Sequence, residues 1–491
     1  MLSWFAVACA PLAPPPPASF PAATAGLVVL ISVDQLPIRL LERARPWLAP
    51  DGGFNRLLGP DAFHATAAHT HAVTHTCPGH ATLVTGASPS VHGIVGNRWL
   101  DAAGKVVYCV DPDGDGTVDL AALRVETLAD PVVAAGGRAV SLGLKDRAPL
   151  LMGGRDPTAV VYFDRKALAF HGPPWARFAV SLDAAWSLRV AGGYGPEIVD
   201  DQPFEGDTFG GRVFPHPPPA DAEGWLRSPF AGEALTTVAI QGISAEDLGH
   251  HRGVDYLAIG YSQTDYIGHT WGPDSWESVD GLLRLDADLA RLFAVLDARL
   301  PGAWTVILTS DHGATPASAP RVLAEPLLAA GRAAAHAAGA PDEDLVLDEP
   351  NLWLPASTAP DVRPAAARAV AKAVAALPDV AGAWAWKVDP PPPMLVGSLD
   401  LERSGDVYVQ LAEGHQWSWG ETTGADHGSG WPADQQVPLL ALGRGVAPGA
   451  ADDLVDTRAV AATVASLLGI SPPAGAELGP LSMMLSNGGR R

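Results

Sequence analysis

The sequence predicts an α/β fold in which a doubly wound, mostly parallel sheet is sandwiched by helices, with inserted cap segments. Several runs of strand length are apolar throughout and rich in β-branched residues, as in LVVLISV at Leu27–Val33. Such runs are typical of strands that are buried on both faces. Segments with apolar residues at helical spacing lie between these runs, and this alternation favours a sheet with helices on both sides.

Each expected element has its own local signal. Strands are expected, in chain order, at residues 27–33, 139–142, 159–163, 256–261, 306–309 and 437–442. A helix is expected over residues 78–85, because Pro78 suits a first helical turn, where a missing N–H costs nothing. Apolar side chains recur every three or four positions over residues 282–296, which predicts a long amphipathic helix.

A last helix is expected to begin near Asp456 and to end at Leu468. The carboxylate of Asp456 is suited to cap the first backbone N–H groups of that helix. Gly469 follows the last apolar residue, and glycine readily adopts the left-handed conformation in which many helices end.

One domain is expected to contain most of the chain, because α/β enzymes often build one core with insertions at this length of 491 residues. Stretches rich in Gly, Pro and Trp or in Ala break the alternation of strands and helices, and we interpret them as insertions. The expected parts are a signal-like, proline-rich segment at 1–25, a catalytic domain at 26–480 with insertions at about 165–245 and 318–425, and a flexible tail at 481–491.

Composition excludes some classes of protein. Hydrophobic residues make up 47% of the chain, which is ample for a large core. The net charge of −22 argues against nucleic-acid binding through a basic face. No internal apolar run approaches the roughly 20 residues of a membrane span. With Cys9, Cys77 and Cys109 as its only cysteines, the chain has no disulfide scaffold, and Cys77 would pair with Cys109 only if the fold brought them together.

Acidic residues follow three of the expected strands. Asp34 and Asp311 come directly after apolar runs, and Asp265 comes four residues after another. Because ligands of open α/β sheets bind beyond the carboxyl ends of the strands, these carboxylates are expected in one crevice. The chain also offers His269, His312 and His427 near them. Mixed Asp and His ligation suits Zn²⁺, with manganese as an alternative, and six ligands suffice for two ions.

Thr76 lies just before an expected helix, where backbone N–H groups and the helix dipole favour an anion. A threonine hydroxyl is a poor nucleophile unless a bound cation lowers its pKa. The combination of Thr76 with two cations points to phosphoryl transfer. The alternative is that Thr76 only caps the helix.

These segments resemble the alkaline phosphatase superfamily, and most closely its bacterial alkaline phosphatases with a threonine nucleophile, which are allied to nucleotide pyrophosphatases/phosphodiesterases. The motifs that carry the resemblance are VDQ, GGFNRLL, THTCPGHATLVTG, HGIVGN, SLGLKDRA, TDYIGHTWGP, TSDHG and DHGSG. The resemblance implies two zinc ions and a phosphothreonine intermediate at Thr76. Asp265, His269 and His427 would hold the ion that activates water, and Asp34, Asp311 and His312 would hold the ion bound to Thr76.

The resemblance also implies the substrate class. Asn97 matches a side chain that contacts a phosphate oxygen, and Lys145 and Arg147 match a basic pair that holds phosphoryl oxygens. A phosphate monoester carries one more charged oxygen than a diester, so these cations favour small phosphate monoesters. A phosphodiesterase or nucleotide pyrophosphatase on the same metals is the alternative, and a non-catalytic binding protein is a third. Cys77 departs from the family pattern, where glycine is expected.

Export to the periplasm or secretion is expected, mainly from this resemblance. Residues 6–9 read AVAC, which resembles a bacterial lipoprotein cleavage site and predicts a lipid anchor if the natural start lies elsewhere. We expect a monomer.

Some candidate sites remain open. The acidic run Asp111–Asp119 resembles the start of a calcium loop, but Ala122 stands where the bidentate glutamate belongs, so an acidic surface turn is the alternative. Four histidines near Thr76 lie outside the family ligand pattern and are expected to pack or to support the ligands, His80 above all. The four are His69, His71, His75 and His80, and the tryptophans Trp417, Trp419 and Trp431 flank His427 and line either a pocket or a lid.

Overall fold

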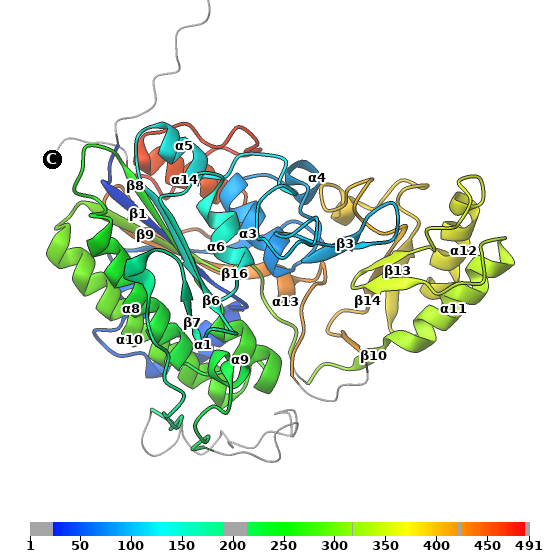
Figure 1. Ribbon diagram of the computed structural model, residues 1–491, viewed down its shortest axis with the longest axis horizontal. Helices are drawn as coiled ribbons and strands as arrows, with labels where there is room; N and C mark the ends of the chain where they lie inside the picture. The colour runs from blue at the N-terminus through cyan, green and yellow to red at the C-terminus, as the bar shows by residue number, and fades with distance from the viewer. Residues whose placement is uncertain (1–22, 190–213, 317, 420–423, 487–491) are drawn as a thin grey trace, which may run out of the picture.

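The computed structural model describes residues 23–189, 214–316, 318–419 and 424–486. Two parts are visible in Figure 1. The large lobe, made of residues 23–189, 214–316 and 424–486, contains the main sheet. The small lobe, made of residues 318–419, coincides with the second predicted insertion and contains its own sheet.

The main sheet of the large lobe has ten strands in the order β17-β2-β16-β9-β1-β8-β5-β6-β7, and β18 also pairs with β2. The five strands from β9 to β6 run parallel, whereas β16 and β7 pair antiparallel with their neighbours. The bounds are β1 Leu27–Val33, β2 Phe63–Ala68, β5 Ala139–Gly143, β6 Ala159–Asp164, β7 Ala169–His171, β8 Asp255–Tyr261, β9 Trp304–Thr309, β16 Gln436–Gly443, β17 Gly449–Ala450 and β18 Val455–Asp456. The predicted fold class is confirmed, and all six predicted strands are present.

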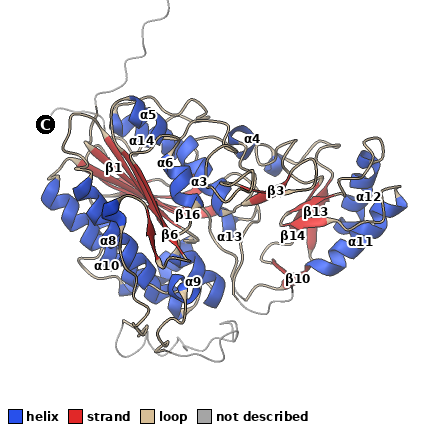
Figure 2. Cartoon of the chain, in the orientation of Figure 1, coloured by secondary structure: helices blue, strands red, loops and turns tan. Residues whose placement is uncertain are grey.

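Helices cover both faces of this sheet (Figure 2). On β1, Val29 and Ile31 face one hydrophobic cluster, while Val28 and Leu30 face the other. The first cluster packs on α1 Ile38–Ala44, α2 Gly53–Leu57, α8 Phe230–Ala245 and α10 Trp276–Arg299, and the second on α3 Thr76–Thr85, α5 Ala129–Ala134, α6 Arg147–Gly153 and α14 Ala459–Leu468. Strands buried on both faces explain why their sequences are apolar throughout.

The small lobe has a four-stranded sheet in the order β11-β12-β14-β13 and a two-stranded pair of β10 with β15. Helices α11 Ala324–Ala337 and α12 Arg363–Ala375 pack together, and their apolar residues join the strands in a separate core. The strands are β10 Arg321–Leu323, β11 Val346–Asp348, β12 Asn351–Trp353, β13 Val380–Trp384, β14 Val407–Leu411 and β15 Gln416–Ser418.

The large lobe has several further elements. They are α4 Pro89–His92, the hairpin of β3 Arg98–Leu100 with β4 Val106–Tyr108, α7 Ala222–Leu226, α9 Gln263–Trp271 and α13 Pro432–Gln435. Short 3₁₀ turns occur at Arg45–Trp47, Pro174–Ala176 and Pro393–Leu395. None of the helices in the described ranges is both long enough and apolar enough to cross a membrane.

Some element bounds differ from the prediction. Helix α3 begins at Thr76 instead of residue 78, so the candidate nucleophile is its first residue. Asp456 belongs to β18, and Arg458 is the N-cap of α14, although Gly469 ends this helix in the left-handed conformation as expected.

Two of the predicted chain segments contain ordered structure. The first predicted insertion contains α8, whose Leu235 and Val238 are buried against the main sheet. Within the predicted tail, Met484 is buried and accepts a hydrogen bond from the Ala447 N–H.

Candidate active site

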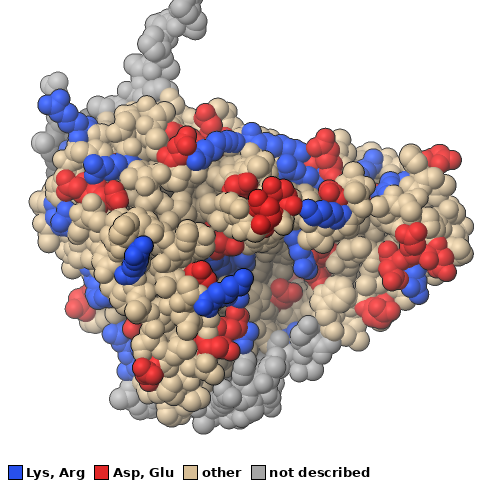
Figure 3. Space-filling view, viewed as in Figure 1, with Lys and Arg blue, Asp and Glu red and all other residues tan. Residues whose placement is uncertain are grey.

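The predicted carboxylates meet at one edge of the main sheet. Asp34 follows β1, Asp311 lies two residues beyond the end of β9, and Asp265 lies in the first turn of α9, shortly after β8. Because these three strands are adjacent and parallel, their carboxyl ends lie side by side. All three aspartates are buried, and Figure 3 shows that the surface is hollowed between the two lobes.

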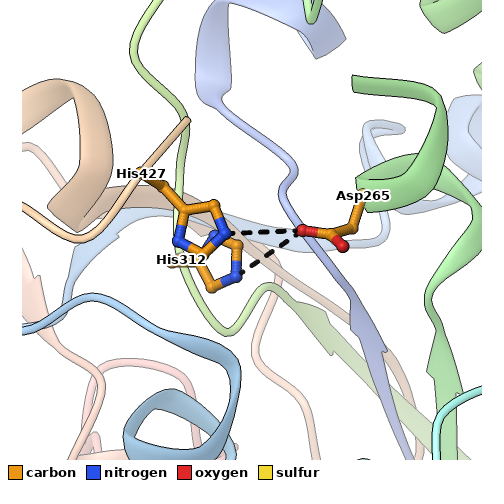
Figure 4. A group of neighbouring side chains, drawn as sticks. All are labelled: Asp265, His312 and His427. Atoms are coloured by element: carbon orange, nitrogen blue, oxygen red, sulfur yellow. Dashed lines mark ion pairs between the residues drawn. The ribbon is translucent and has the colours of Figure 1, made fainter. Parts of the chain in front are cut away.

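The first group of potential ligands is centred on Asp265 (Figure 4). The distance from its Oδ1 atom to Nε2 is 3.3 Å for His269, 3.6 Å for His427 and 4.0 Å for His312. The rings of His312 and His427 stack with their centroids 3.6 Å apart. Carboxylate and imidazole atoms that converge at these distances suit a divalent cation such as Zn²⁺.

The second group consists of Asp34, Asp311 and His80. His80 Nε2 lies 3.5 Å from Asp34 Oδ1, and His80 Nδ1 lies 3.3 Å from Asp311 Oδ2. His312 Nε2 is also 3.3 Å from Asp311 Oδ2, so His312 lies between the two groups. The partition in which His312 belongs to the Asp34 side stays a prediction.

Backbone carbonyls orient the imidazole rings. Nδ1 of His269 bonds to Ala425 O at 2.8 Å, and Nδ1 of His427 bonds to Thr74 O at 2.8 Å. Because a carbonyl only accepts, each Nδ1 carries a proton, so Nε2 is the ring atom that faces Asp265 and would coordinate a cation. Burial lowers the pKa of His269, but attraction to Asp265 outweighs burial and raises it to about 9, so a cation would displace the Nε2 proton of His269 on binding. His312 has the same arrangement, with Gly313 O at 2.9 Å from its Nδ1. Burial lowers the pKa of His427 to about 4, which keeps this ring neutral as a ligand must be.

The donor atoms of this site fit a bound cation. Within the described part of the chain, both carboxylate oxygens of Asp34, Oδ2 of Asp311 and Nε2 of His312 are buried and have no hydrogen-bond partner. A buried polar atom without a partner is costly, and a coordinated ion satisfies it. These residues would therefore hold the two ions that the sequence predicts.

Lys145 bridges the two groups. Its Nζ atom lies 2.6 Å from Asp265 Oδ2 and 3.3 Å from Asp34 Oδ2. Burial lowers the pKa of Lys145, but attraction to these carboxylates outweighs burial and raises it overall. For Asp34, burial and the nearby Asp311 raise the pKa. The lysine is thus held positive among the ligands.

Thr76 is buried at the first position of α3. The next residue, Cys77, forms a disulfide with Cys109, so the fold does bring these cysteines together. The Cys77 N–H donates to Asn97 Oδ1 at 2.9 Å, and Arg147 Nη1 donates to the hydroxyl of Tyr108 at 3.3 Å. The predicted substrate-binding residues Asn97 and Arg147 are therefore linked to the nucleophile segment.

Comparison with known proteins gives the family. The chain matches the model of the type I phosphodiesterase / nucleotide pyrophosphatase family over residues 28–430. It belongs to this family. It is 28% identical to alkaline phosphatase PhoV of Synechococcus elongatus over 94% of this chain and 93% of PhoV. It is 27% identical to alkaline phosphatase PafA of Elizabethkingia meningoseptica over 94% of each chain. The resemblance predicted from the motifs is confirmed.

The fold of this family member is also similar to a solved one. The crystal structure of wild-type PafA superimposes with a TM-score of 0.84 at 25% identity, over 96% of this chain and 100% of PafA. The similarity includes both lobes, since it spans nearly the whole chain.

Two contacts of the site, those of Gln35 and Tyr108, carried no signal in the sequence. Gln35 adopts a positive φ of 56°, and its side chain donates to Asp265 Oδ1 at 3.3 Å. His80 touches two aspartates, in agreement with its expected supporting position. Tyr108, the last residue of β4, donates from its hydroxyl to Asp146 at the N-terminus of α6. His80 lies four residues after Thr76 on α3, and its Nδ1 bonds to Thr76 O at 2.9 Å.

The other histidines near Thr76 are buried in packing positions. His69 Nε2 donates to Ser310 O at 2.9 Å, and the ring of His71 lies edge-on to that of His69. His75 contacts the ring of His427 with centroids 5.6 Å apart. This agrees with the expectation that these rings support the site through packing and hydrogen bonding.

The possible calcium loop and the tryptophans remain predictions. Carboxylate oxygens of Asp111, Asp113 and Asp115 lie within 4.8 Å of one another. Trp431 Nε1 donates to Leu411 O, and the Trp419 indole donates to Glu349. Trp417 lines a small cavity of 20 Å³ that His427 also borders.

Proposed function

We propose that this protein is a phosphate monoester hydrolase that acts through a phosphothreonine at Thr76 with two bound zinc ions. The relatives PhoV and PafA, which match almost the whole chain, support a phosphatase hydrolase. The observation that carries the finer proposal is the convergence of two groups of buried carboxylates and imidazoles at the sheet edge where Thr76 begins α3.

The reaction has two halves. The Thr76 oxygen attacks phosphorus, the P–O bond to the alcohol breaks, and the alcohol leaves with a proton taken from solvent. Water then attacks the phosphothreonine, and phosphate leaves as the threonine hydroxyl is restored. The bound ions would lower the pKa of the Thr76 hydroxyl and of water and would stabilise the charge that builds on the phosphoryl oxygens.

Residues of the chain hold the phosphoryl group. Thr76 lies at the N-terminus of α3, where the positive end of the helix dipole favours an anion. Lys145 and Arg147 come from the loop and the first turn of α6, and they supply positive charge for the oxygens that a diester would have esterified. Asn97 accepts from the Cys77 N–H through its Oδ1, which leaves its amide N–H₂ to donate to a phosphate oxygen.

The second candidate function is a phosphodiesterase or nucleotide pyrophosphatase, because the matching family model carries that description. The buried lysine that bridges the ligand groups favours the monoester instead. The two candidates differ in one measurable ratio, the kcat/KM for p-nitrophenyl phosphate against that for bis-p-nitrophenyl phosphate. A higher value for the bis-ester would reject the monoester proposal.

The nucleophile is tested with Thr76→Ala and a matched control, Thr237→Ala, in α8. We expect mass spectrometry of acid-quenched enzyme to find phosphate on Thr76 in wild type and in the control, and none in Thr76→Ala. Monoester turnover by Thr76→Ala should fall by a factor of about a thousand or more. Elemental analysis of the purified protein should find about two zinc ions per chain, and a preparation fully active with manganese alone would change the assignment of the metal.

We also propose a periplasmic or secreted location and a monomeric state. The Cys77–Cys109 disulfide supports export, since disulfides persist in oxidising compartments. Fractionation of the native host and sedimentation of the purified protein test these two points. Enzyme found only in the cytoplasmic fraction would reject export, and a sedimenting dimer would reject the monomer.

A further inference from the structure

One hydrogen-bonded frame connects the nucleophile segment with the arginine of the substrate site. Cys77, which follows Thr76, is bonded to Cys109. Asn97 joins the same two residues through the backbone, because its Oδ1 accepts from the Cys77 N–H at 2.9 Å and its carbonyl accepts from the Cys109 N–H at 3.0 Å. The end of β4 is therefore fixed to the start of α3 by one covalent bond and two hydrogen bonds.

Tyr108 extends this frame to Arg147. The Tyr108 hydroxyl donates to Asp146 Oδ1 at 2.9 Å, and the same oxygen of Tyr108 accepts from Arg147 Nη1 at 3.3 Å. Asp146 is the N-cap of α6, and its Oδ1 also accepts from the Arg147 N–H at 2.7 Å. The phenol thus uses its one proton and one lone pair on the two residues that begin α6.

In the ranges that the structure describes, the Arg147 side chain has few other hydrogen bonds that could orient its guanidinium. Arg147 Nε is buried and has no hydrogen-bond partner among the described residues, so this nitrogen does not help to orient the guanidinium. Burial raises the pKa of Tyr108, so its hydroxyl remains a donor in alkaline solution. A flexible arginine side chain has many rotamers, and it loses conformational entropy when it binds a substrate. A partner that already fixes the side chain in the free enzyme reduces the entropy that is lost on binding.

We propose that Tyr108, tethered to the nucleophile segment by the Cys77–Cys109 disulfide, is a positioning residue that fixes Arg147 for the phosphoryl oxygens and so contributes to monoester preference. This inference rests on the proposed monoesterase function. It concerns Tyr108, Cys77 and Cys109, which the comparison of sequence motifs did not assign to the site. Because Tyr108 acts through Arg147, its loss should affect monoesters selectively.

The test is Tyr108→Phe, which removes the hydroxyl and keeps the ring. We expect kcat/KM for p-nitrophenyl phosphate to fall by about tenfold, since one hydrogen bond to a charged group is lost. For bis-p-nitrophenyl phosphate, kcat/KM should stay within about twofold of wild type. The matched control is Tyr256→Phe. Tyr256 is a buried residue near the start of β8, whereas the site lies beyond the end of that strand, so this substitution should change neither kcat/KM value.

A double-mutant cycle separates positioning from a general structural effect. In an Arg147→Ala background, Tyr108→Phe should cause no further loss of monoester activity, because the group that it positions is already absent. Equal loss on both esters, an additive loss in the double variant, or no loss in Tyr108→Phe would each overturn the proposal. Failure of the proposed function would look different, since wild type itself would then prefer the bis-ester.

The tether is tested with Cys77→Ser/Cys109→Ser. We expect this variant to lose monoester activity selectively, in the same direction as Tyr108→Phe, with little further loss when the two changes are combined. A loss that is equal for both esters, or unchanged rates, would remove the disulfide from the proposal. If the variant does not fold, the Tyr108→Phe cycle still decides whether Tyr108 positions Arg147.

Discussion

Replacing Lys145 by Met should destabilise the metal-free protein far more than the zinc-loaded protein. The ammonium lies 2.6 Å from Asp265 and 3.3 Å from Asp34, and all three groups are almost fully buried. At an effective dielectric constant of about 20 these contacts are worth about 6 and about 5 kcal/mol of attraction. Desolvation of the lysine offsets much of this, and removal of one member of a buried ion pair costs about 3–5 kcal/mol.

Bound cations should remove most of that cost. Two divalent ions would neutralise the carboxylates that Lys145 contacts, and they would repel its charge. We therefore expect Lys145→Met to lose about 3–5 kcal/mol of unfolding free energy after chelation and about 1 kcal/mol or less with zinc. By linkage, the free energy of zinc binding to the variant should be more favourable by the difference between these two losses. A difference of about 3 kcal/mol corresponds to about a hundredfold or more in zinc affinity.

Urea denaturation with EDTA and with excess zinc measures both losses, and a competition titration measures the zinc affinity. Lys166→Met, which removes an exposed lysine near β6, is the matched control and should change neither form. The same loss of unfolding free energy in both forms would refute the reasoning, because Lys145 would then act through packing and not through charge.

Three further predictions concern stability. A Cβ atom on Gly79 would lie 2.1 Å from the Asp311 carbonyl oxygen, so Gly79→Ala should cost about 1–3 kcal/mol in urea denaturation, and unchanged stability would contradict this close packing. Burial raises the pKa of Asp288 from its ordinary 3.8 to about 6, so ionisation of this carboxyl destabilises the fold as the pH rises from about 4 to 6. Relative to wild type, the unfolding free energy of Asp288→Asn should therefore increase by up to about 3 kcal/mol between pH 4 and pH 8. A difference between the two proteins that does not depend on pH would reject this. If the Asp111–Asp119 loop binds calcium, readdition of Ca²⁺ alone after chelation should raise the melting temperature, and no shift would remove the site.

The parts of this structure that follow from local chemistry could be predicted from the sequence. The strand β1 and the ends of β8 and β9 can be recognised in the sequence, because a strand that is buried on both faces is apolar throughout. The first polar residues after such a run mark its end. The motif around Thr76 then adds an expectation of the chemistry, which stays a prediction.

Other parts depend on contacts that one sequence does not contain. Asp456 has a good capping side chain, yet it pairs with β2 as β18, so α14 begins after Arg458. Helix α8 lies in a segment rich in turn residues, but its Leu235 and Val238 fill the space beneath the main sheet. In both cases tertiary packing decides between local preferences.

The assignment of ligands to each ion is the clearest case of information that lies in three dimensions. The family resemblance implies one common ion for His312 and its neighbour Asp311, and His312 Nε2 does lie 3.3 Å from Asp311 Oδ2. Yet its ring also stacks on His427, and the same Nε2 lies 4.0 Å from Asp265 Oδ1. A shift of less than an ångström would move this nitrogen from one group to the other. Because a lone pair coordinates one ion, His312 would serve only one of the two proposed cations, and binding of that cation would decide which donors remain for the other.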